Sequence, residues 1–234
     1  MPLTQRISTD ERPLVYQSSL PWSGLEALQV ACLGVILLSI EPPSMQEELR
    51  LTPREIARME GMGPRRQMSF TTARVALKRL TRQLGLVESD RPDSTIETIS
   101  LDDQRPYLGE SKLFCSVSHK GRIVVAVAHS HPVGVDLEEV SEKALRVLHP
   151  FGIGGEQRLI ARSSLGAERA ATRVWTSKEA VSKALGLHLF QALQEVEVVY
   201  IGEMESQIRF QGKSYPVKHS EGERQVLTLI TCDQ

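Results

Sequence analysis

The sequence predicts an α+β protein made of two similar subdomains, and three observations lead to this prediction. Segments with helical periodicity and capping residues alternate with segments whose apolar residues recur at every second position. Two long helical segments both end in Leu-Gly-Leu, at 84–86 and 185–187, and predicted strands follow each. The chain of 234 residues is long enough for two α+β units of roughly 100 residues each.

In the first half, the apolar run at 30–40 predicts a buried strand, since it is too short to span a bilayer. Thr52, Pro53 and Glu55 form a capping-box pattern that predicts the start of a helix. Glycine and proline then separate this helix from a longer one. The elements expected here are helices at 53–61 and 66–84, an alternating segment at 94–101, and strands at 112–119 and 122–129 joined by a turn at Lys120-Gly121.

The second half repeats this order of helices and strands. The segment VGVDLEEV, 133–140, reads as a strand, and helical patterns follow it before the chain alternates again. The expected helices lie at about 141–149, 155–163 and 169–185, and the expected antiparallel strands at 196–201, 207–212 and 224–232.

Composition limits the classes of protein that the chain can belong to. The formal charge of −1 argues against a dedicated nucleic-acid binder, and no apolar run is long enough for a membrane-spanning helix. Cys32, Cys115 and Cys232 lie far apart and form no CxxC pair, which excludes a zinc cage or disulfide framework and fits a reducing compartment. The first residues contain acidic groups and no secretory pattern, so we expect a cytoplasmic protein.

The strand at 133–140 carries two carboxylates on one face. Val133, Val135 and Leu137 point one way, so Asp136 and Glu138 point the other, about 6.5–7 Å apart between Cα atoms. Carboxylates this close repel each other unless they are solvated or neutralised by a cation. Oxygen ligands without histidine or thiol favour Mg²⁺. The alternative is an edge strand with a solvated acidic face.

The helix at 169–185 supplies a third carboxylate, Glu179, with Lys178 and Lys183 beside it. One interpretation is an ordinary surface ion pair between Glu179 and Lys183, four residues apart. The other is a centre for a metal-bound diphosphate, in which three carboxylates hold Mg²⁺ and the lysines neutralise phosphate oxygens.

Two further groups of residues are candidates for phosphate binding. Basic residues recur at multiples of four on the helix at 66–84, which indicates either a solvated face or a polyanion site; they are Arg66, Arg74, Lys78 and Arg82. Ser118 and His119 precede a tight turn, where they could donate hydrogen bonds to a phosphate. No acid or nucleophile elbow accompanies them, so a serine hydrolase is not indicated.

These motifs together resemble the paired signature of 4′-phosphopantetheinyl transferases. VGVDLEEV is similar to (I/V)G(I/V)D-x-E, and WTSKEAVSK at 175–183 to (F/W)-(S/C/T)-x-K-E-(S/A)-x-x-K. The upstream RPYL and FCSVSHKG segments resemble the family's GKP and SHS segments. The resemblance covers about residues 52–200 and is closest to the Sfp-type subgroup, single chains with two similar α+β halves.

The resemblance implies a fold and a reaction. It implies a first subdomain at 1–131, which contacts the coenzyme A nucleotide, and a second at 132–234, which carries the Mg²⁺ and catalytic motifs. A pseudo-two-fold axis would relate the two subdomains, and the active site would lie at their interface. The family transfers the phosphopantetheine arm of coenzyme A to a serine of an acyl- or peptidyl-carrier protein and releases 3′,5′-ADP. The fused halves imply a monomer.

It also implies roles for single residues. Asp136 and Glu138 would be metal ligands, and Glu179 would be the third ligand, the general base, or both in turn. The implied coenzyme A contacts are Lys183 and Lys178 at the phosphates, Ser118, His119, Arg66 and Arg74 near the 3′-phosphate, and Arg105-Pro106 beside the adenine. Glu156 matches an acidic position near the metal or the incoming serine.

Four positions depart from the family pattern, namely Gln104, Arg105, Lys120 and His188, but none of these departures removes a proposed catalytic group. Two other functions stay open. One is an Mg²⁺-dependent hydrolase of nucleotide diphosphates, which would consume coenzyme A without a carrier protein. The other is a non-catalytic module that binds carrier proteins.

Overall fold

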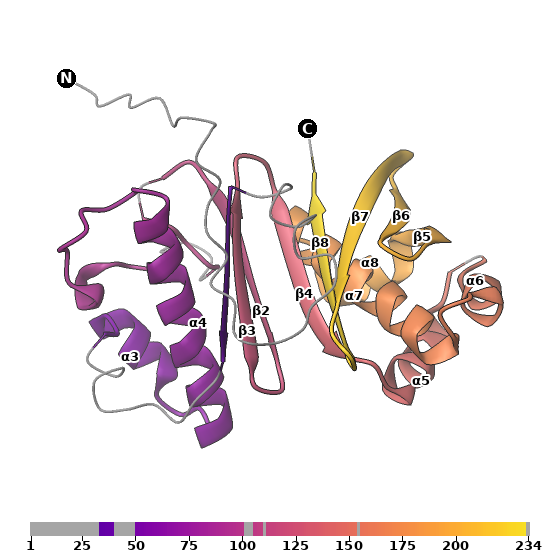
Figure 1. Cartoon of the computed structure of the whole chain (residues 1–234), viewed down its shortest axis with the longest axis horizontal. Coiled ribbons are helices and arrows are strands. Elements are labelled where there is room, and N and C mark those ends of the chain that lie inside the picture. The colour runs from indigo at the N-terminus through magenta and orange to yellow at the C-terminus, as the bar shows by residue number, and fades with distance from the viewer. Residues whose placement is uncertain (1–32, 40–49, 101–104, 110, 154, 233–234) are drawn as a thin grey trace.

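The computed structural model describes residues 33–39, 50–100, 105–109, 111–153 and 155–232. It contains a three-stranded sheet in the order β1-β3-β2 and a five-stranded sheet in the order β4-β8-β7-β6-β5, and all the pairings are antiparallel. Helices cover the outer face of each sheet (Figure 1). The predicted α+β class is therefore confirmed.

The first sheet and its helices come from the first part of the chain. The strands are β1 (Gly34–Ser39), β2 (Phe114–Lys120) and β3 (Ile123–His129), and the helices are α3 (Pro53–Met59) and α4 (Pro64–Gln83). The capping box at Thr52 and Glu55 forms as predicted, with hydrogen bonds in both directions. The turn between β2 and β3 contains Gly121 at φ 58°, a conformation that favours glycine.

The second sheet and its helices come from the rest. The elements are β4 (Val133–Glu139), α5 (Glu142–Phe151), α6 (Glu156–Arg162), α7 (Ala167–Leu185), α8 (Leu189–Glu195), β5 (Glu197–Ile201), β6 (Glu205–Phe210), β7 (Lys213–Glu221) and β8 (Gln225–Thr231). The proposed division of the chain at residues 131 and 132 falls in the turn between β3 and β4.

One prediction for a strand was wrong, and one strand was missed. Residues 94–101 were expected to alternate as a strand, but the structure has a 3₁₀ helix at Asp93–Thr95 and an isolated bridge between Ile99 and Pro106, while residue 101 lies outside the described part. Strand β7 was not among the expected strands, and it contains Pro216, which has no N–H to donate. At Pro216, β7 pairs with β6 alone, because pairing with β8 begins only at Val217. Pro216 is therefore tolerated, since one side of β7 is an unpaired edge at this position.

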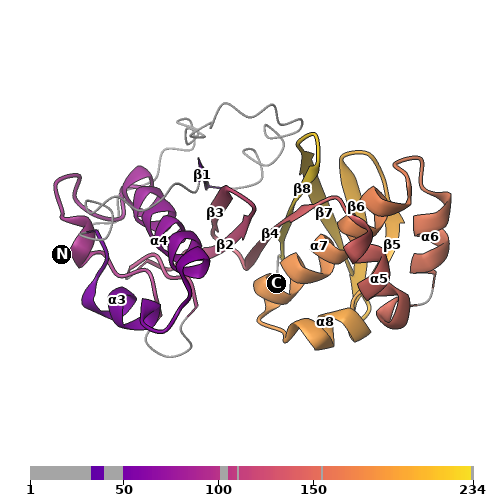
Figure 2. The same ribbon diagram turned by 90° about the horizontal axis from the view of Figure 1, so that it is seen from below.

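The layers run from α4 through the two sheets to α7 (Figure 1, and from below in Figure 2). Alternate residues of β3 divide between two cores, because successive side chains of a strand point to opposite faces. Val124 and Ala126 pack against α4, whereas Ile123, Val125 and Val127 pack between the sheets. The inner face of the second sheet supplies Val133, Val135, Leu137, Leu227 and Leu229.

The two long helices end in the same way. Gly85 and Gly186 both follow a helix with left-handed φ, 63° and 68°, and the next leucine N–H closes the turn. Leu86 N donates to Thr81 O at 3.0 Å, and Leu187 N donates to Ser182 O at 2.9 Å. The sequence repeat Leu-Gly-Leu thus corresponds to the same C-cap in both helices.

Each long helix also buries a lysine against the short helix before it. Lys78 of α4 binds Glu55 in the first turn of α3, with Nζ 2.6 Å from Oε2. Lys178 of α7 binds Glu156 in the first turn of α6, with Nζ 3.0 Å from Oε1. All four side chains are at most 1% exposed.

Candidate active site

Strand β4 and helix α7 approach each other closely at Gly134. A Cβ atom on Gly134 would lie 1.8 Å from the Ala180 carbonyl oxygen, so only glycine permits this backbone contact. Asp136 and Glu138 follow on the same face of β4, and Glu179 precedes Ala180 on α7. The missing side chain therefore lets α7 bring Glu179 over the two strand carboxylates.

The three carboxylates converge. One oxygen from each of Asp136, Glu138 and Glu179 lies within 4.8 Å of the others. Asp136 is 2% exposed, while Glu138 and Glu179 are half-buried. Such an arrangement of oxygen donors is one that Mg²⁺ binds in proteins, together with phosphate oxygens and water.

Lys183 lies beside this cluster. Its Nζ donates to Asp136 Oδ1 at 2.8 Å and to the Val135 carbonyl oxygen at 2.9 Å. The second carboxylate oxygen, Asp136 Oδ2, is buried and has no hydrogen-bond partner among the described residues. A buried charged oxygen without a partner is costly, so the donor set fits a divalent cation at this position.

The electrostatics of the cluster change the pKa of Glu179. Burial and the neighbouring Asp136 carboxylate raise the pKa of Glu179 to about 8, and Lys183 only partly opposes this. Glu138 is neutralised on its outer side by an ion pair with Lys120. A cation among the three acids would relieve the repulsion that makes ionisation of Glu179 unfavourable.

His119 lies on the wall of the same site. Burial, followed by the positive charge of Lys183, lowers the pKa of its imidazole, and the nearby Asp136 opposes the change. At neutral pH the ring is therefore mainly neutral, so it can act as both hydrogen-bond donor and acceptor.

An open cleft of about 430 Å³ joins the acidic cluster to the first half of the molecule. The cleft is lined by the three carboxylates, Lys183 and His119, and also by basic side chains of α3 and α4, namely Arg58, Arg66 and Arg74. A second cleft of about 870 Å³ shares Val117 and Lys183 with the first, and Arg105 and Pro106 line it. Lys183 thus lies where the two clefts meet.

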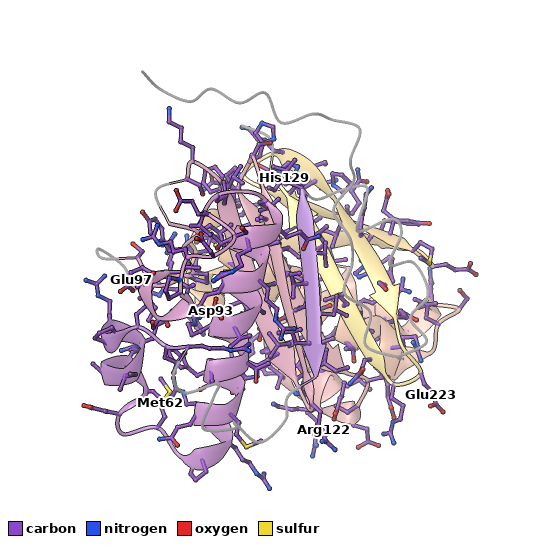
Figure 3. All side chains as sticks on the ribbon, turned by 60° about the vertical axis from the view of Figure 1, so that its left-hand side comes forward. Met62, Asp93, Glu97, Arg122, His129 and Glu223 are labelled. Atoms are coloured by element: carbon purple, nitrogen blue, oxygen red, sulfur yellow. The ribbon has the colours of Figure 1, made fainter. Side chains whose placement is uncertain are left out.

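Arg74 is held firmly in the cleft wall. Its Nη1 donates to the Thr98 carbonyl oxygen at 2.9 Å, and its guanidinium lies 4.9 Å from the centre of the Phe70 ring. Thr98 in turn donates its hydroxyl to Glu55, the partner of Lys78. Asp93, which lies on the segment that includes Thr98 and is labelled in Figure 3, pairs with Arg82 of α4.

The four basic residues of α4 that were predicted to share a face do not form one. A step of four residues turns an α-helix by about 40° beyond a full turn, so positions 66 and 82 differ by about 160°. Arg66 and Arg74 line the cleft, but Lys78 is buried against Glu55, and Arg82 binds Asp93 at 2.8 Å. The prediction of a shared face was wrong for Lys78 and Arg82.

Lys178 and Glu156 were predicted near the phosphates or the metal, and the structure places both elsewhere. Lys178 Nζ donates to the Leu193 and Val196 carbonyl oxygens at 3.1 and 2.6 Å and pairs with Glu156. Glu156 also accepts the Val198 N–H at 2.7 Å. Burial lowers the pKa of Lys178, and Glu156 opposes the change. This pair joins α6, α7 and α8 inside the second half.

Ser118 is close to the predicted site, but its hydroxyl has other partners than expected. It was expected to contact the 3′-phosphate region, yet its hydroxyl is buried and donates to Asp136 Oδ1 at 2.9 Å.

Four residues at or beside the cleft were not predicted as site residues, namely Arg58, Met62, Phe70 and Lys120. Arg58 and Met62 join the cleft only because α3 folds back beside α4, which no pattern in the sequence indicates.

Comparison with known proteins agrees with this site. The sequence profile of the 4′-phosphopantetheinyl transferase superfamily matches residues 132–230, a range that spans β4 and α7. The second half of the chain is thus similar to this superfamily, a class of transferases. Enterobactin synthase component D is similar along most of the chain, in Escherichia coli O157:H7 and in Shigella flexneri alike. Each is 21% identical over 198 residues, which cover 84% of this chain and 92% of the relative.

None of the helices in the described ranges is long and apolar enough to cross a membrane.

Proposed function

We propose that the chain transfers the 4′-phosphopantetheine arm of coenzyme A to a serine of an acyl- or peptidyl-carrier protein, with Mg²⁺, and releases 3′,5′-ADP. The observation that carries the proposal is the convergence of Asp136, Glu138 and Glu179 beside Lys183, in a cleft that basic side chains of α3 and α4 also line. The similarity to enterobactin synthase component D, along with the superfamily, supports it.

The acidic cluster is the proposed metal site. Asp136 and Glu138 would hold Mg²⁺ from the strand, and Glu179 would be the third ligand. Once bound, Mg²⁺ supplies charge neutralisation to the diphosphate of coenzyme A. The unpartnered Asp136 Oδ2 supports this assignment, because it offers the cation a buried oxygen that no described donor occupies.

Glu179 is the proposed general base. A serine hydroxyl is a weak nucleophile at neutral pH, so a base must take its proton as the oxygen attacks the β-phosphorus. Glu179 extends from α7 toward the strand carboxylates and is half-buried rather than enclosed, so an incoming hydroxyl can reach it. Lys183 would neutralise the diphosphate oxygen that gains charge as the leaving nucleotide departs.

The remaining phosphate of coenzyme A has a proposed place among the basic side chains of the same cleft. Coenzyme A carries a diphosphate and a separate 3′-phosphate, so a matching site needs cations in two places. Lys183 serves the first, and Arg66, Arg74 and His119 line the same cleft for the second. Arg105 and Pro106 line the adjoining cleft, where we place the adenine.

The wider assignments are also proposals. The two halves, each with a long helix packed on a sheet, support an Sfp-type monomer whose site lies between them. We expect it to act in the cytoplasm, where coenzyme A and carrier proteins occur. The neutral overall charge gives no support for a nucleic-acid partner.

The test is mass spectrometry of candidate apo-carrier proteins incubated with the chain, coenzyme A and Mg²⁺. A mass increase equal to one phosphopantetheine group, abolished by replacing the carrier serine with alanine, is the expected result. Consumption of coenzyme A without any carrier protein would instead identify a hydrolase. Carrier binding without modification or Mg²⁺ dependence would identify a non-catalytic module.

A further inference from the structure

We propose that Ser118 is a positioning residue for Asp136, whose carboxylate it holds so that one oxygen faces the metal site. The inference rests on the metal role of Asp136 proposed above. It differs from the role that the sequence resemblance implied, which was a contact of Ser118 with coenzyme A. The structure gives the Ser118 hydroxyl two protein partners instead.

The direction of the Ser118 hydroxyl proton follows from these partners. Ser118 Oγ accepts the backbone N–H of Leu137 at 3.2 Å and lies 2.9 Å from Asp136 Oδ1. An ionised carboxylate oxygen can only accept, so Ser118 must donate its proton to Asp136. The same hydroxyl therefore accepts a hydrogen bond from the backbone of β4 and donates one to a side chain of β4.

The two oxygens of Asp136 have different surroundings as a result. Oδ1 receives both Ser118 and Lys183, at 2.9 and 2.8 Å, whereas Oδ2 has no partner in the described part of the chain. Two donors on one oxygen fix the rotation of the carboxylate. The other oxygen is left for a cation.

Ser118 and Lys183 differ in how freely they can leave Asp136. The Lys183 side chain is 31% exposed, has a long stem and lies where the two clefts meet, so it can turn toward a substrate phosphate. Ser118 is 7% exposed and fixed by the Leu137 N–H. Ser118 is therefore the donor that keeps Asp136 oriented while Lys183 binds phosphate.

Ser116 provides a matched control on the same face of the same strand. It is also buried, and its Oγ accepts the Val135 N–H at 3.1 Å, which links β2 to β4 in the same way. The strands β2 and β4 belong to different sheets, so these serine hydroxyls replace ladder hydrogen bonds between them. Of the two serines, Ser118 is the one whose hydroxyl donates a hydrogen bond to Asp136.

The experiment compares Ser118→Ala with Ser116→Ala. Mn²⁺ binding is measured by electron paramagnetic resonance with the full chain and coenzyme A, without carrier protein. Loss of a residue that orients a metal ligand typically weakens metal binding by about 10–100-fold, so we expect at least a tenfold loss for Ser118→Ala. Ser116→Ala should stay within about twofold, because the surroundings of Asp136 are unchanged.

A second measurement needs neither metal nor activity. The urea midpoints of Ser118→Ala, Asp136→Asn and the double variant form a thermodynamic cycle. The effects of Ser118→Ala and Asp136→Asn should be non-additive, whereas those of Ser116→Ala and Asp136→Asn should add. This comparison also reveals a variant that weakens metal binding merely by unfolding.

Three results would overturn the inference: unchanged Mn²⁺ affinity in Ser118→Ala, equal losses in the two serine variants, or additive effects of Ser118→Ala and Asp136→Asn. If the unaltered chain modifies a carrier protein and binds Mn²⁺ but Ser118→Ala binds it equally well, the inference alone fails. Failure of the unaltered chain to bind Mn²⁺ would remove the metal role proposed for Asp136, and the inference with it.

Discussion

Replacing Lys78 by methionine should destabilise the protein strongly, although Lys78 lines neither of the two clefts described above. Lys78 Nζ is fully buried and donates to the Arg50 carbonyl oxygen at 2.6 Å, to Glu55 Oε2 at 2.6 Å and to the Asp93 carbonyl oxygen at 2.9 Å. Burial lowers the pKa of Lys78, and its contact with Glu55 opposes the change. Methionine has a similar length but cannot donate.

The expected cost follows from what Lys78→Met leaves behind. Glu55 would remain buried with its charge uncompensated, which typically costs about 3–5 kcal/mol. A domain has a free energy of unfolding of about 5–15 kcal/mol, so this loss is large but leaves a folded population. Adding Glu55→Gln removes the buried charge and keeps an oxygen for the Thr52 N–H. The double variant should therefore regain about 1–3 kcal/mol.

Urea unfolding followed by circular dichroism at pH 7 measures these differences. Arg79→Met is the matched control, since Arg79 is the next residue on α4 and is exposed; it should change the free energy of unfolding by at most about 0.5 kcal/mol. A loss below about 1 kcal/mol for Lys78→Met would refute the reasoning. A double variant no more stable than the single one would refute it equally.

Three further predictions concern activity and pH. Glu179→Gln should lower the rate of transfer by about 10²–10⁴-fold in a mass-spectrometric assay while coenzyme A binding stays within a few-fold; a rate near that of the unaltered chain would exclude Glu179 as the base. Arg74→Ala should raise the KM for coenzyme A about tenfold with Arg79→Ala as control, and equal KM values would mean that Arg74 serves packing alone. His219 is fully buried between Ser206 and Thr228, and burial, with Arg173 second, lowers its pKa well below 6.5. Below about pH 6.5 the unfolded chain therefore binds a proton that the folded chain does not, so the free energy of unfolding should decrease by up to about 1.4 kcal/mol for each pH unit that the pH is lowered. Urea titrations at pH 5 and 7.5 measure this difference. His219→Gln should remove the pH dependence, and an equal pH dependence in that variant would contradict the prediction.

The acidic cluster could be predicted because its residues obey simple periodicities. Asp136 and Glu138 are two apart on a strand, so they share a face, and Glu179 and Lys183 are four apart on a helix, so they also share one. In the structure Asp136 and Glu138 do lie together with Glu179, and Lys183 also reaches Asp136. The metal and catalytic roles given to these residues stay predictions until they are tested.

The same rule explains why Lys178 was misplaced. It is adjacent to Glu179, and adjacent helix positions point about 100° apart, so Lys178 cannot extend in the direction of both Glu179 and Lys183. The buried neighbours Val174, Ala170 and Val181 identify its side of α7 as the core side. A lysine on a core face predicts a buried acid, here Glu156.

Other features depend on contacts between distant parts of the chain. The cleft is lined by residues of α3 and α4 together with residues of β2, β4 and α7. Neither a helical nor a strand pattern in the sequence predicts which of these elements will pack together. The hydroxyls of Ser116 and Ser118 bridge two sheets, a use of serine on a strand that alternation alone does not predict.

Gly134 has a consequence for how the chemistry could be altered. A methyl group added there would act as a wedge between β4 and α7, since it would overlap the Ala180 carbonyl oxygen. The wedge would separate Glu179 from Asp136 without changing either acid, so a chain with every proposed catalytic group intact could still be inert. Any search among similar sequences for silent relatives should therefore inspect this one small position as carefully as the acids themselves.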